Sequence, residues 1–462
     1  MNKKSLYTII IFIVLASLDN AAIAILPAIT RLVAVRLLGN EYLEGYVLNL
    51  VSIMTFIIAF TSFVWGYWGD KYPRKKLLLY GTVIWVVMCF LTYFSLNYVM
   101  LAIFQIFAGI GLGAIASVGF SVIVDFVSAN RRGLALSLWG LSQAAGTMIG
   151  YLIAVLFAAD FGWAYPFLVI SIVSVGFIIA YFFTEEPKRG AKEKELQKLF
   201  EEGKLYEYRI RRQDLKDIIT NRSNIWLILQ GAFAQVGWGA IAILPSIFGH
   251  KLSLYGFTVD QGQEVGGLIA ALFQLGGIFS ILFGWLGDKL QKRTLKGRSI
   301  ISAFGVFTGI PLFITMLLIP YNFDTTSFSD PISFVFGQLA SNPLFLIAFI
   351  CSVFAAMMMS ADSPNFFALV GDVNLPEHRG TLFGLTNFTN GIGRSLGPFI
   401  LSGFQILLTP IVGFELSWVY GMVFIQFFFL ATGIFFLLTA RAAPHNIREV
   451  KKTLESRARQ EI

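Results

Sequence analysis

The sequence repeats itself at long range. The hexapeptide AIAILP occupies residues 22–27 and again 240–245, an offset of 218 residues. The pattern Gly-x-x-Gly-Asp-Lys, at 66–71 and 284–289, recurs at the same offset. One match between apolar stretches could arise by chance, but two patterns at one offset indicate a duplicated unit. We therefore expect a fold built from two similar halves.

A second pair of patterns recurs at a larger offset. Asp-x6-Arg-Gly begins at Asp125 and again at Asp372, an offset of 247 residues. The same register continues into Gly146-xxx-Gly150 and Gly393-xxx-Gly397. The second copy therefore carries about thirty additional residues, most of which we assign to an external loop at 321–342.

The composition places both copies in a membrane. The chain is 56% hydrophobic and 13% charged, whereas a soluble domain has about 25% charged residues. A helical crossing takes about 20 apolar residues, and a helix satisfies its own backbone hydrogen bonds in lipid. Segments of alternating polarity, typical of a membrane β-barrel, are absent from the sequence. We predict twelve spans, at residues 6–35, 43–69, 77–96, 98–127, 133–158, 162–184, 224–248, 263–287, 299–320, 343–371, 380–409 and 415–440.

Positive charge is distributed unevenly between the two sides. The net charge is +8, and almost all Lys and Arg residues lie in alternate loops and at the two ends of the chain. The opposite side holds only Arg31, Arg36 and Lys251. Positive loops stay on the cytoplasmic side, so we expect a multi-pass protein of the cell (cytoplasmic) membrane with both termini cytoplasmic. Each copy then has an even number of spans, and the halves share one orientation.

These observations predict an all-α integral membrane fold with 12 transmembrane helices in two pseudo-symmetric six-helix bundles. We assign an N-terminal bundle to residues 1–184 and a C-terminal bundle to 223–440. A charged cytoplasmic linker at 185–222 carries an amphipathic helix, with a regulatory or partner-binding role as the alternative. Residues 441–462 form a basic cytoplasmic tail that suits a helix resting on anionic headgroups. Internal repeats in a membrane protein of this kind are typical of secondary transporters.

The loop between spans 2 and 3, GYWGDKYPRKK at 66–76, resembles the signature of the major facilitator superfamily. A weaker copy lies at 284–289, and the resemblance extends from span 1 to span 12. It implies a cytoplasmic gate that latches the halves when the transporter faces outward, with Asp70 facing a helix N-terminus and Arg74 a carboxylate. The alternative is topogenic charge alone. The gate residues so implied are Gly66, Gly69, Asp70, Arg74, Lys75, Asp125, Arg132, Gly284, Gly287, Asp288, Asp372 and Arg379.

Two further resemblances concern branches of that superfamily. Span 1, from Leu18 to Pro27, looks like the first helix of drug-efflux branches. Residues 67–75 and 186–190 resemble Spinster-type lysolipid transporters. Proton-coupled relatives often carry an Arg where this chain has Gln105, so the resemblance does not extend to that proton site.

Ionisable side chains inside the predicted spans are candidates for function, because a charge at mid-membrane costs about 2.5–3.5 kcal/mol or more. We hypothesise that Asp362 and Arg394 form a buried pair and that Asp19 is the proton- or cation-sensitive group. A structural carboxylate is the alternative for Asp19, and interhelical hydrogen bonding is the alternative for Gln105 and Gln143. The full candidate substrate and coupling set is Asp19, Asn20, Gln105, Gln143, Gln235, Trp238, Asp362, Asn365, Asn387, Asn390 and Arg394.

The sequence therefore favours a secondary active transporter that exports or flips an amphipathic organic solute or lysolipid by alternating access. Proton or cation coupling is left open. The Met357–Met359 run and many Phe residues suit an adaptable apolar interior. The alternatives are a facilitative uptake carrier for a small polar metabolite, a channel, or a non-transporting receptor with the same fold. As partners we expect the small-molecule or lipid substrate and membrane lipids, with no nucleic acid and a monomeric protein.

Catalytic and metal chemistry have little support in the sequence. The histidines His250, His378 and His445 are assigned to loops or the tail, and no Cys/His cluster occurs. Cys89 and Cys351 lie in apolar segments of different halves and are expected to be buried small side chains. We expect no enzyme activity, no cofactor and no metal.

Overall fold

The computed structural model describes residues 3–119, 132–185, 216 and 218–460. Within these ranges the secondary structure is helical and without strands. The first half contains α1 (Lys3–Ala28), α2 (Thr30–Leu37), η1 (Glu41–Leu43), α3 (Glu44–Lys71), α4 (Arg74–Thr92), α5 (Tyr98–Ala114), the π-turn η2 (Ile115–Gly119), α7 (Arg132–Phe161) and α8 (Tyr165–Phe182).

The second half is longer. It contains α11 (Arg222–Ile241), α12 (Leu244–Ser253), α13 (Val259–Phe273), η4 (Gln274–Phe279), α14 (Ser280–Arg293), α15 (Gly297–Leu318), η5 (Thr325–Ser327), α16 (Pro331–Ser341), α17 (Pro343–Met359), α18 (Asp362–Asp372), α19 (Pro376–Val412) and α20 (Phe414–Gln460).

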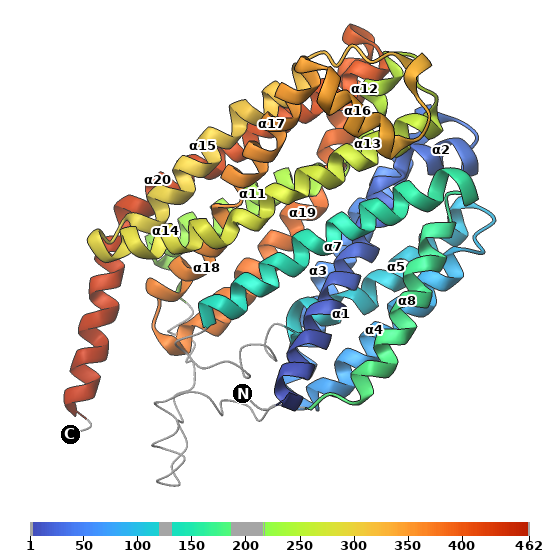
Figure 1. The fold of residues 1–462 in the computed structure, drawn as a ribbon. Coiled ribbons are helices and arrows are strands. Elements are labelled where there is room, and N and C mark those ends of the chain that lie inside the picture. The colour runs from blue at the N-terminus through green and yellow to red at the C-terminus, as the bar shows by residue number, and fades with distance from the viewer. Residues whose placement is uncertain (1–2, 120–131, 186–215, 217, 461–462) are drawn as a thin grey trace.

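Ten of the described helices are long and apolar enough to span a membrane, and α11 with α12, bent by 46°, makes an eleventh. The shorter apolar helix α5 of 17 residues continues into η2 and lies where the fourth of the twelve predicted spans is expected. The two groups of helices lie side by side in Figure 1. The predicted fold class of two six-helix bundles is confirmed.

Two ends of the molecule are useful landmarks. The α12 end holds α2, α12 and α16, and the terminal end is where α1 begins and α20 ends (Figure 1). At the α12 end, α1 and α2 of the first half contact α12 and α13 of the second. Farther along, α3 packs on α19 and α7 packs on α13, so four helices form most of the contact between the bundles.

The repeated glycines occupy equivalent crossings in the two halves. Gly146 and Gly150 of α7 lie against the backbone of α1, where a Cβ on Gly150 would meet the Ala21 carbonyl oxygen at 2.5 Å. Gly393 and Gly397 of α19 lie in the same way against the backbone of α11. Small residues spaced four apart allow two membrane helices to approach backbone to backbone. The duplication seen in the sequence is thus a duplicated helix crossing.

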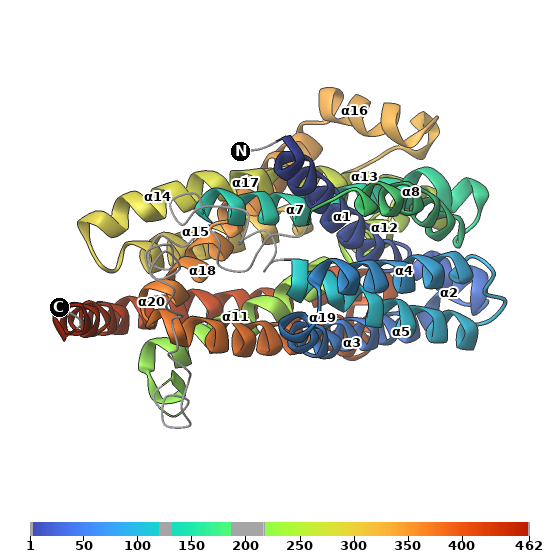
Figure 2. The same ribbon diagram turned by 90° about the horizontal axis from the view of Figure 1, so that it is seen from below.

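The connection at 321–342 differs from the loop that we predicted, because it contains α16. Asp330 caps this helix by accepting a hydrogen bond from the Ser333 backbone nitrogen at 2.8 Å, and Pro331 occupies its first turn. The same Ser333 N–H holds the pKa of the Asp330 carboxyl below its usual value. An Asp-Pro pair is a helix-start signal. Figure 2 shows α16 at the edge of the molecule, where it packs on α13 and α17.

The bundle boundaries at 184 and 223 stay a prediction. The amphipathic linker helix falls on residues 186–215, which lie outside the described ranges. The basic tail is helical, and it continues α20 without interruption from the last crossing to Gln460.

Candidate functional site

Asp19 lies in the interior of the first bundle with an unsatisfied carboxylate. Its side chain is 1% exposed, and within the described part of the chain neither carboxylate oxygen has a hydrogen-bond partner. The Trp85 indole N–H, which has no other partner, lies close to this carboxylate and offsets only part of the cost of its burial. Asn20 instead donates to the carbonyl of Ala16 in its own helix at 2.7 Å. A buried carboxylate without partners is costly, so this position suits a group that binds a proton or a cation.

The predicted pair between Asp362 and Arg394 is not formed, and this hypothesis is wrong. Asp362 accepts a hydrogen bond from Gln230 of α11 at 2.9 Å. Arg394 of α19 lies where its backbone meets Gly239, nine residues farther along α11. At 1.5 Å per residue the two levels differ by about 14 Å. Asp362 and Arg394 therefore lie at different depths in the membrane.

Arg394 has no ion pair among the described residues. It is half-buried, and its guanidinium lies near the hydroxyl of Tyr151 on α7. Tyr151 donates to the carbonyl of Ala242 at 3.0 Å, which ties α7 to the turn between α11 and α12. Arg394 thus lies close to the contact between the bundles with its charge uncompensated.

Other candidates take part in helix packing. Gln105 donates to the Thr92 hydroxyl at 3.0 Å and joins α5 to α4, as the interhelical alternative predicts. Asn365 donates to the carbonyls of Ala361 (2.9 Å) and Phe283 (3.3 Å). Asn390, in the amide orientation that satisfies its hydrogen bonds, donates to the carbonyls of Thr386 and Gly231. These side chains hold helices together within one bundle.

The remaining candidates are spread over several surfaces. Gln143 and Asn387 are exposed, and Gln235 is half-buried. Trp238 packs edge-on against Phe429 with ring centroids 5.7 Å apart. The structure therefore does not gather the predicted substrate and coupling set into one cluster.

The signature glycines at the terminal end bring helices of the same half together. A Cβ on Gly69 would lie 3.1 Å from Val118 of η2, and one on Gly284 would lie 3.3 Å from Pro364 of α18. Gly287 packs on Asn365, and Gly66 faces Ser117 at 3.6 Å. The side chains of Asp70, Asp125, Arg132 and Arg379 lie outside the described set, so their gate role stays a prediction.

Arg298, at the start of α15, joins two of the predicted gate carboxylates. It donates to Asp372 at 2.8 Å and to Asp288 at 2.7 Å, all within the second bundle. In the first bundle, Lys75 donates to the carbonyls of Phe182 and Thr184 at the end of α8. Sequence reasoning did not single out Arg298, although the two repeated acidic positions require a nearby cation.

Replacing Arg298 by Gln is expected to lower thermal stability slightly. The change removes the ion pairs that Arg298 makes with Asp288 and Asp372, but both carboxylates are partly exposed, so we expect a loss of about 0.5–1 kcal/mol. Thermal unfolding followed by tryptophan fluorescence measures it, with the exposed Arg293→Gln as a matched control. A loss equal to that of the control would contradict a joining role for Arg298.

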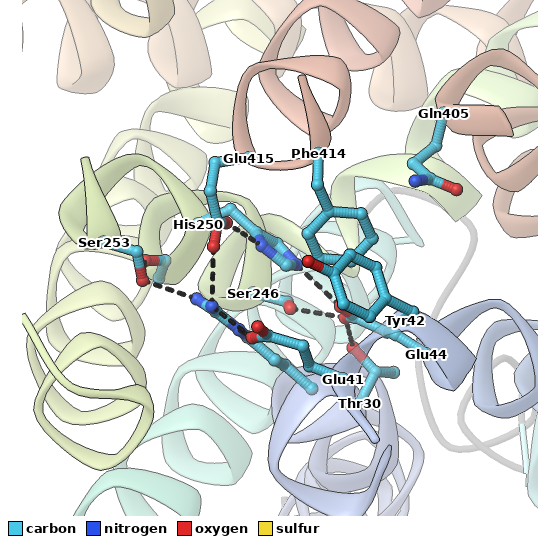
Figure 3. A network of polar contacts seen from close by, with 12 residues as sticks. Thr30, Glu41, Tyr42, Glu44, Ser246, His250, Ser253, Gln405, Phe414 and Glu415 are labelled. Carbon is cyan, nitrogen blue, oxygen red and sulfur yellow. Dashed lines mark hydrogen bonds and ion pairs between the residues drawn. The ribbon is translucent and has the colours of Figure 1, made fainter. Parts of the chain in front are cut away.

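A polar network at the α12 end was not predicted. His250, assigned to a loop, lies on α12 with its side chain fully buried. Its Nε2 lies 2.6 Å from Glu44 of α3, and its Nδ1 lies 2.5 Å from Glu415 of α20. The ring stacks on Trp418 at 5.1 Å. Figure 3 shows the imidazole between the two carboxylates.

The assignment of His250 was wrong because α12 continues the seventh span beyond its bend and runs to Ser253. The hydrophobicity of the seventh span ends before the helix does. The sequence did contain a signal for a polar network at this end. One basic and two acidic residues lie near the outer ends of the first two spans: Arg31, Glu41 and Glu44.

Arg31 of α2 extends the same network. Its Nη2 donates to Glu41 at 2.6 Å and to Glu415 at 2.8 Å, and its Nη1 donates to Ser253 at 2.8 Å. Arg36 forms a more exposed ion pair with Asp260 at 2.7 Å. These contacts join the first bundle to the second, so this end of the molecule is held closed.

Lys251 makes its contacts within the second bundle, unlike its neighbour His250. Its ammonium donates to the carbonyls of Met316, Leu317 and Ile319 at 3.3, 2.8 and 2.6 Å, and it lies 3.5 Å above the Tyr321 ring. A cation there caps the C-terminus of α15. This lysine fixes a helix end within its own bundle.

Two six-helix bundles with duplicated crossings, joined along four helices and closed at one end by ion pairs, have the architecture of a membrane transport protein. The sequence matches the Major Facilitator Superfamily over residues 8–398. The chain belongs to that superfamily and is a membrane transporter.

Relatives and solved structures agree with this assignment. The chain is 23% identical over 416 residues to "Protein spinster homolog 3" of Danio rerio, covering 85% of this chain and 76% of the relative. It is 23% identical over 412 residues to "Sphingosine-1-phosphate transporter SPNS2" of Danio rerio, with the same coverage of 85% and 76%. A bacterial homologue of the human lysosomal transporter Spinster, inward-facing and occupied, has the same fold, with TM-score 0.69, 15% identity and coverage of 96% and 99%. The resemblance to Spinster-type transporters is confirmed.

Proposed function

We propose that this protein is a secondary active transporter that moves an amphipathic organic solute or lysolipid across the cytoplasmic membrane, with Asp19 binding the coupling proton or cation. The observation that carries the coupling is the Asp19 carboxylate, buried in α1 with both oxygens unpaired. An ionised carboxylate in that position is unfavourable. It therefore gains a proton or a cation when access to solvent closes, and releases it when access opens.

Arg394 supports an anionic headgroup on the substrate. It is half-buried and has no carboxylate partner among the described residues, and a phosphate or carboxylate would supply the missing charge. One of the relatives named above is a sphingosine-1-phosphate transporter, whose named substrate carries a phosphate. Trp238, half-buried and packed on the buried Phe429, offers an apolar ring to the apolar part of such a substrate.

The orientation follows from the charge distribution of the loops. The Lys- and Arg-rich connections lie at the terminal end, so we propose that both termini are cytoplasmic and that the α12 end faces outward. The ion pairs of Arg31 and His250 then close the outer side.

The test is transport by the purified full chain in liposomes. Counterflow of a labelled lysophospholipid, such as a lysophosphatidic acid, is expected for a carrier and not for a channel. Absence of any solute movement with a panel of anionic and neutral amphiphiles would favour the non-transporting receptor. Accumulation unaffected by a pH or sodium gradient would favour the facilitative carrier.

Replacing Arg394 by Ala is expected to weaken binding of the anionic amphiphile by about 10- to 100-fold, because a charge-assisted hydrogen bond is worth about 1.5–3 kcal/mol. Arg394→Lys keeps the charge and should lose less affinity. Ligand-dependent thermal shift measures both. The exposed Arg293→Ala is the control for loss of a positive charge elsewhere. Equal affinity in Arg394→Ala and the wild type would exclude Arg394 from the headgroup site.

A further inference from the structure

The network at the α12 end contains a histidine whose two ring nitrogens both face carboxylates. Nε2 lies 2.6 Å from an oxygen of Glu44, and Nδ1 lies 2.5 Å from an oxygen of Glu415. A neutral imidazole has one N–H donor and one acceptor nitrogen. With two ionised carboxylates, the acceptor nitrogen would face an oxygen lone pair at hydrogen-bond distance. The geometry therefore requires one further proton in this group of three side chains.

Glu44 does not supply that proton, because its second oxygen already accepts from two hydroxyl groups. Thr30 and Ser246 donate to this oxygen at 2.5 and 2.6 Å. The Glu44 side chain is fully buried, and these two donors favour its ionised form. The extra proton then lies between His250 and Glu415 or on the imidazole.

The other charges around His250 increase its affinity for a proton. Glu41 of η1 and Arg31 of α2 complete the cluster, and Arg31 pairs with both Glu41 and Glu415. Three carboxylates therefore face one arginine and the histidine. The Lys251 ammonium, on the same helix as His250, is turned toward the carbonyls of α15. Arg36 and Asp260 neutralise each other at the rim. The cluster has an excess of negative charge that an imidazolium reduces.

The partners of His250 come from both bundles. Glu44 and Arg31 belong to α3 and α2 of the first bundle, whereas His250 and Glu415 belong to α12 and α20 of the second. Separation of the bundles at this end would remove Glu44 from His250 and Arg31 from Glu415. The site is therefore complete only in the closed arrangement, which Figure 3 shows.

We propose that His250, Glu44 and Glu415 form a second proton-binding site, separate from Asp19, which is assembled when the bundles close at the α12 end and which releases its proton when they open. The proposal rests on the alternating access proposed above. Because the closed arrangement binds the proton more tightly, acid on this side favours closure. Closure is lost as the pH rises through the midpoint of the site.

The test measures closure directly and uses no substrate. Spin labels at Leu96→Cys of the first bundle and Leu254→Cys of the second, both exposed at the α12 end, report the distance between bundles in a Cys89→Ala, Cys351→Ala background. Double electron–electron resonance is recorded on the full chain in lipid nanodiscs from about pH 5 to pH 8, the range in which histidine titrates. The wild type is expected to shift from a short to a long distance as the pH rises.

Two variants remove different parts of the site. His250→Gln is expected to abolish the pH dependence of the distance. Glu44→Gln keeps the shape but removes one negative charge, so it should move the midpoint to lower pH by about 1–3 units. Arg36→Gln breaks an ion pair between the bundles without touching His250, so it should weaken closure at every pH while the distance stays pH-dependent. An unmoved midpoint in both His250→Gln and Glu44→Gln overturns the proposal.

The same measurements in an Asp19→Asn background separate this site from the proposed coupling site. The pH-dependent distance change is expected to persist there, whatever happens to transport. Its disappearance in Asp19→Asn alone would assign the response to Asp19 and overturn the proposal. Nitrogen-15 NMR of labelled histidine gives an independent readout, because the chain has only three histidines. His250 is expected to show imidazolium shifts at about pH 7.5, where a histidine with the ordinary pKa of about 6.5 is mostly neutral, and a neutral His250 in the closed form would also overturn it.

Discussion

Asp19→Asn is expected to uncouple transport from its driving ion while leaving the fold at least as stable as the wild type. The carboxylate is buried without a partner, and leaving such a group unsatisfied costs about 1–3 kcal/mol, more when it is charged. Asparagine has nearly the same shape and no charge. We therefore expect an equal or higher thermal unfolding temperature, together with loss of accumulation driven by a pH gradient.

The measurement combines thermal unfolding with uptake and counterflow across a range of pH. Counterflow should persist, because it needs no net movement of a coupling ion. Cys89→Ser is a matched control, since Cys89 lies near Asp19 and serine removes no charge. A pH profile for Asp19→Asn that matches the wild type would remove Asp19 from the coupling role. A large fall in stability would instead favour a structural carboxylate.

Gly393→Val is expected to prevent stable folding of the second bundle. A Cβ at this position would overlap the Ala232 carbonyl oxygen and lie 3.1 Å from its carbon, so backbone would have to move. Overpacking among side chains costs about 1–3 kcal/mol, and backbone contacts relax less easily, so we expect more than about 3 kcal/mol. Size-exclusion chromatography and thermal unfolding of the detergent-solubilised protein measure the loss.

Gly403 provides the matched control on the same helix. Nothing lies within 4 Å of a Cβ built there, so Gly403→Val should behave like the wild type. Gly146→Val, at the equivalent crossing of the first bundle, should resemble Gly393→Val because its Cβ would overlap the Ser17 carbonyl oxygen. Wild-type stability in Gly393→Val would show that these crossings can separate at little cost.

The fold could be predicted from the sequence because lipid imposes strong requirements on it. Each crossing must be apolar, helical and about 20 residues long, and the offsets of 218 and 247 residues recorded the duplication. The helix α16 was missed because we assigned a polar, Ser- and Thr-rich segment to a loop. Its Asp330-Pro331 start was nevertheless visible in the sequence.

The site was less predictable, because partners depend on the depth and rotation of each helix. Asp362 and Arg394 were each recognised as charges inside spans, but α11 places them at different levels. Gln105 was placed in the substrate and coupling set with interhelical hydrogen bonding as the alternative, and the structure shows the alternative contact, a hydrogen bond to Thr92. His250 was missed because its partners Glu44 and Glu415 lie more than 160 residues away in the chain.

The last helix of the chain has a mechanical consequence. Helix α20 contains 47 residues without a break, which corresponds to about 70 Å at 1.5 Å per residue. The helix is packed in the second bundle as far as Ile447, and from there it continues to Gln460. Because the end of the helix lies far from the bundle, a tilt of the bundle in the bilayer displaces this end more than it displaces the packed part. A fluorophore attached near the end would therefore report the tilt of the second bundle from the cytoplasmic side that we propose.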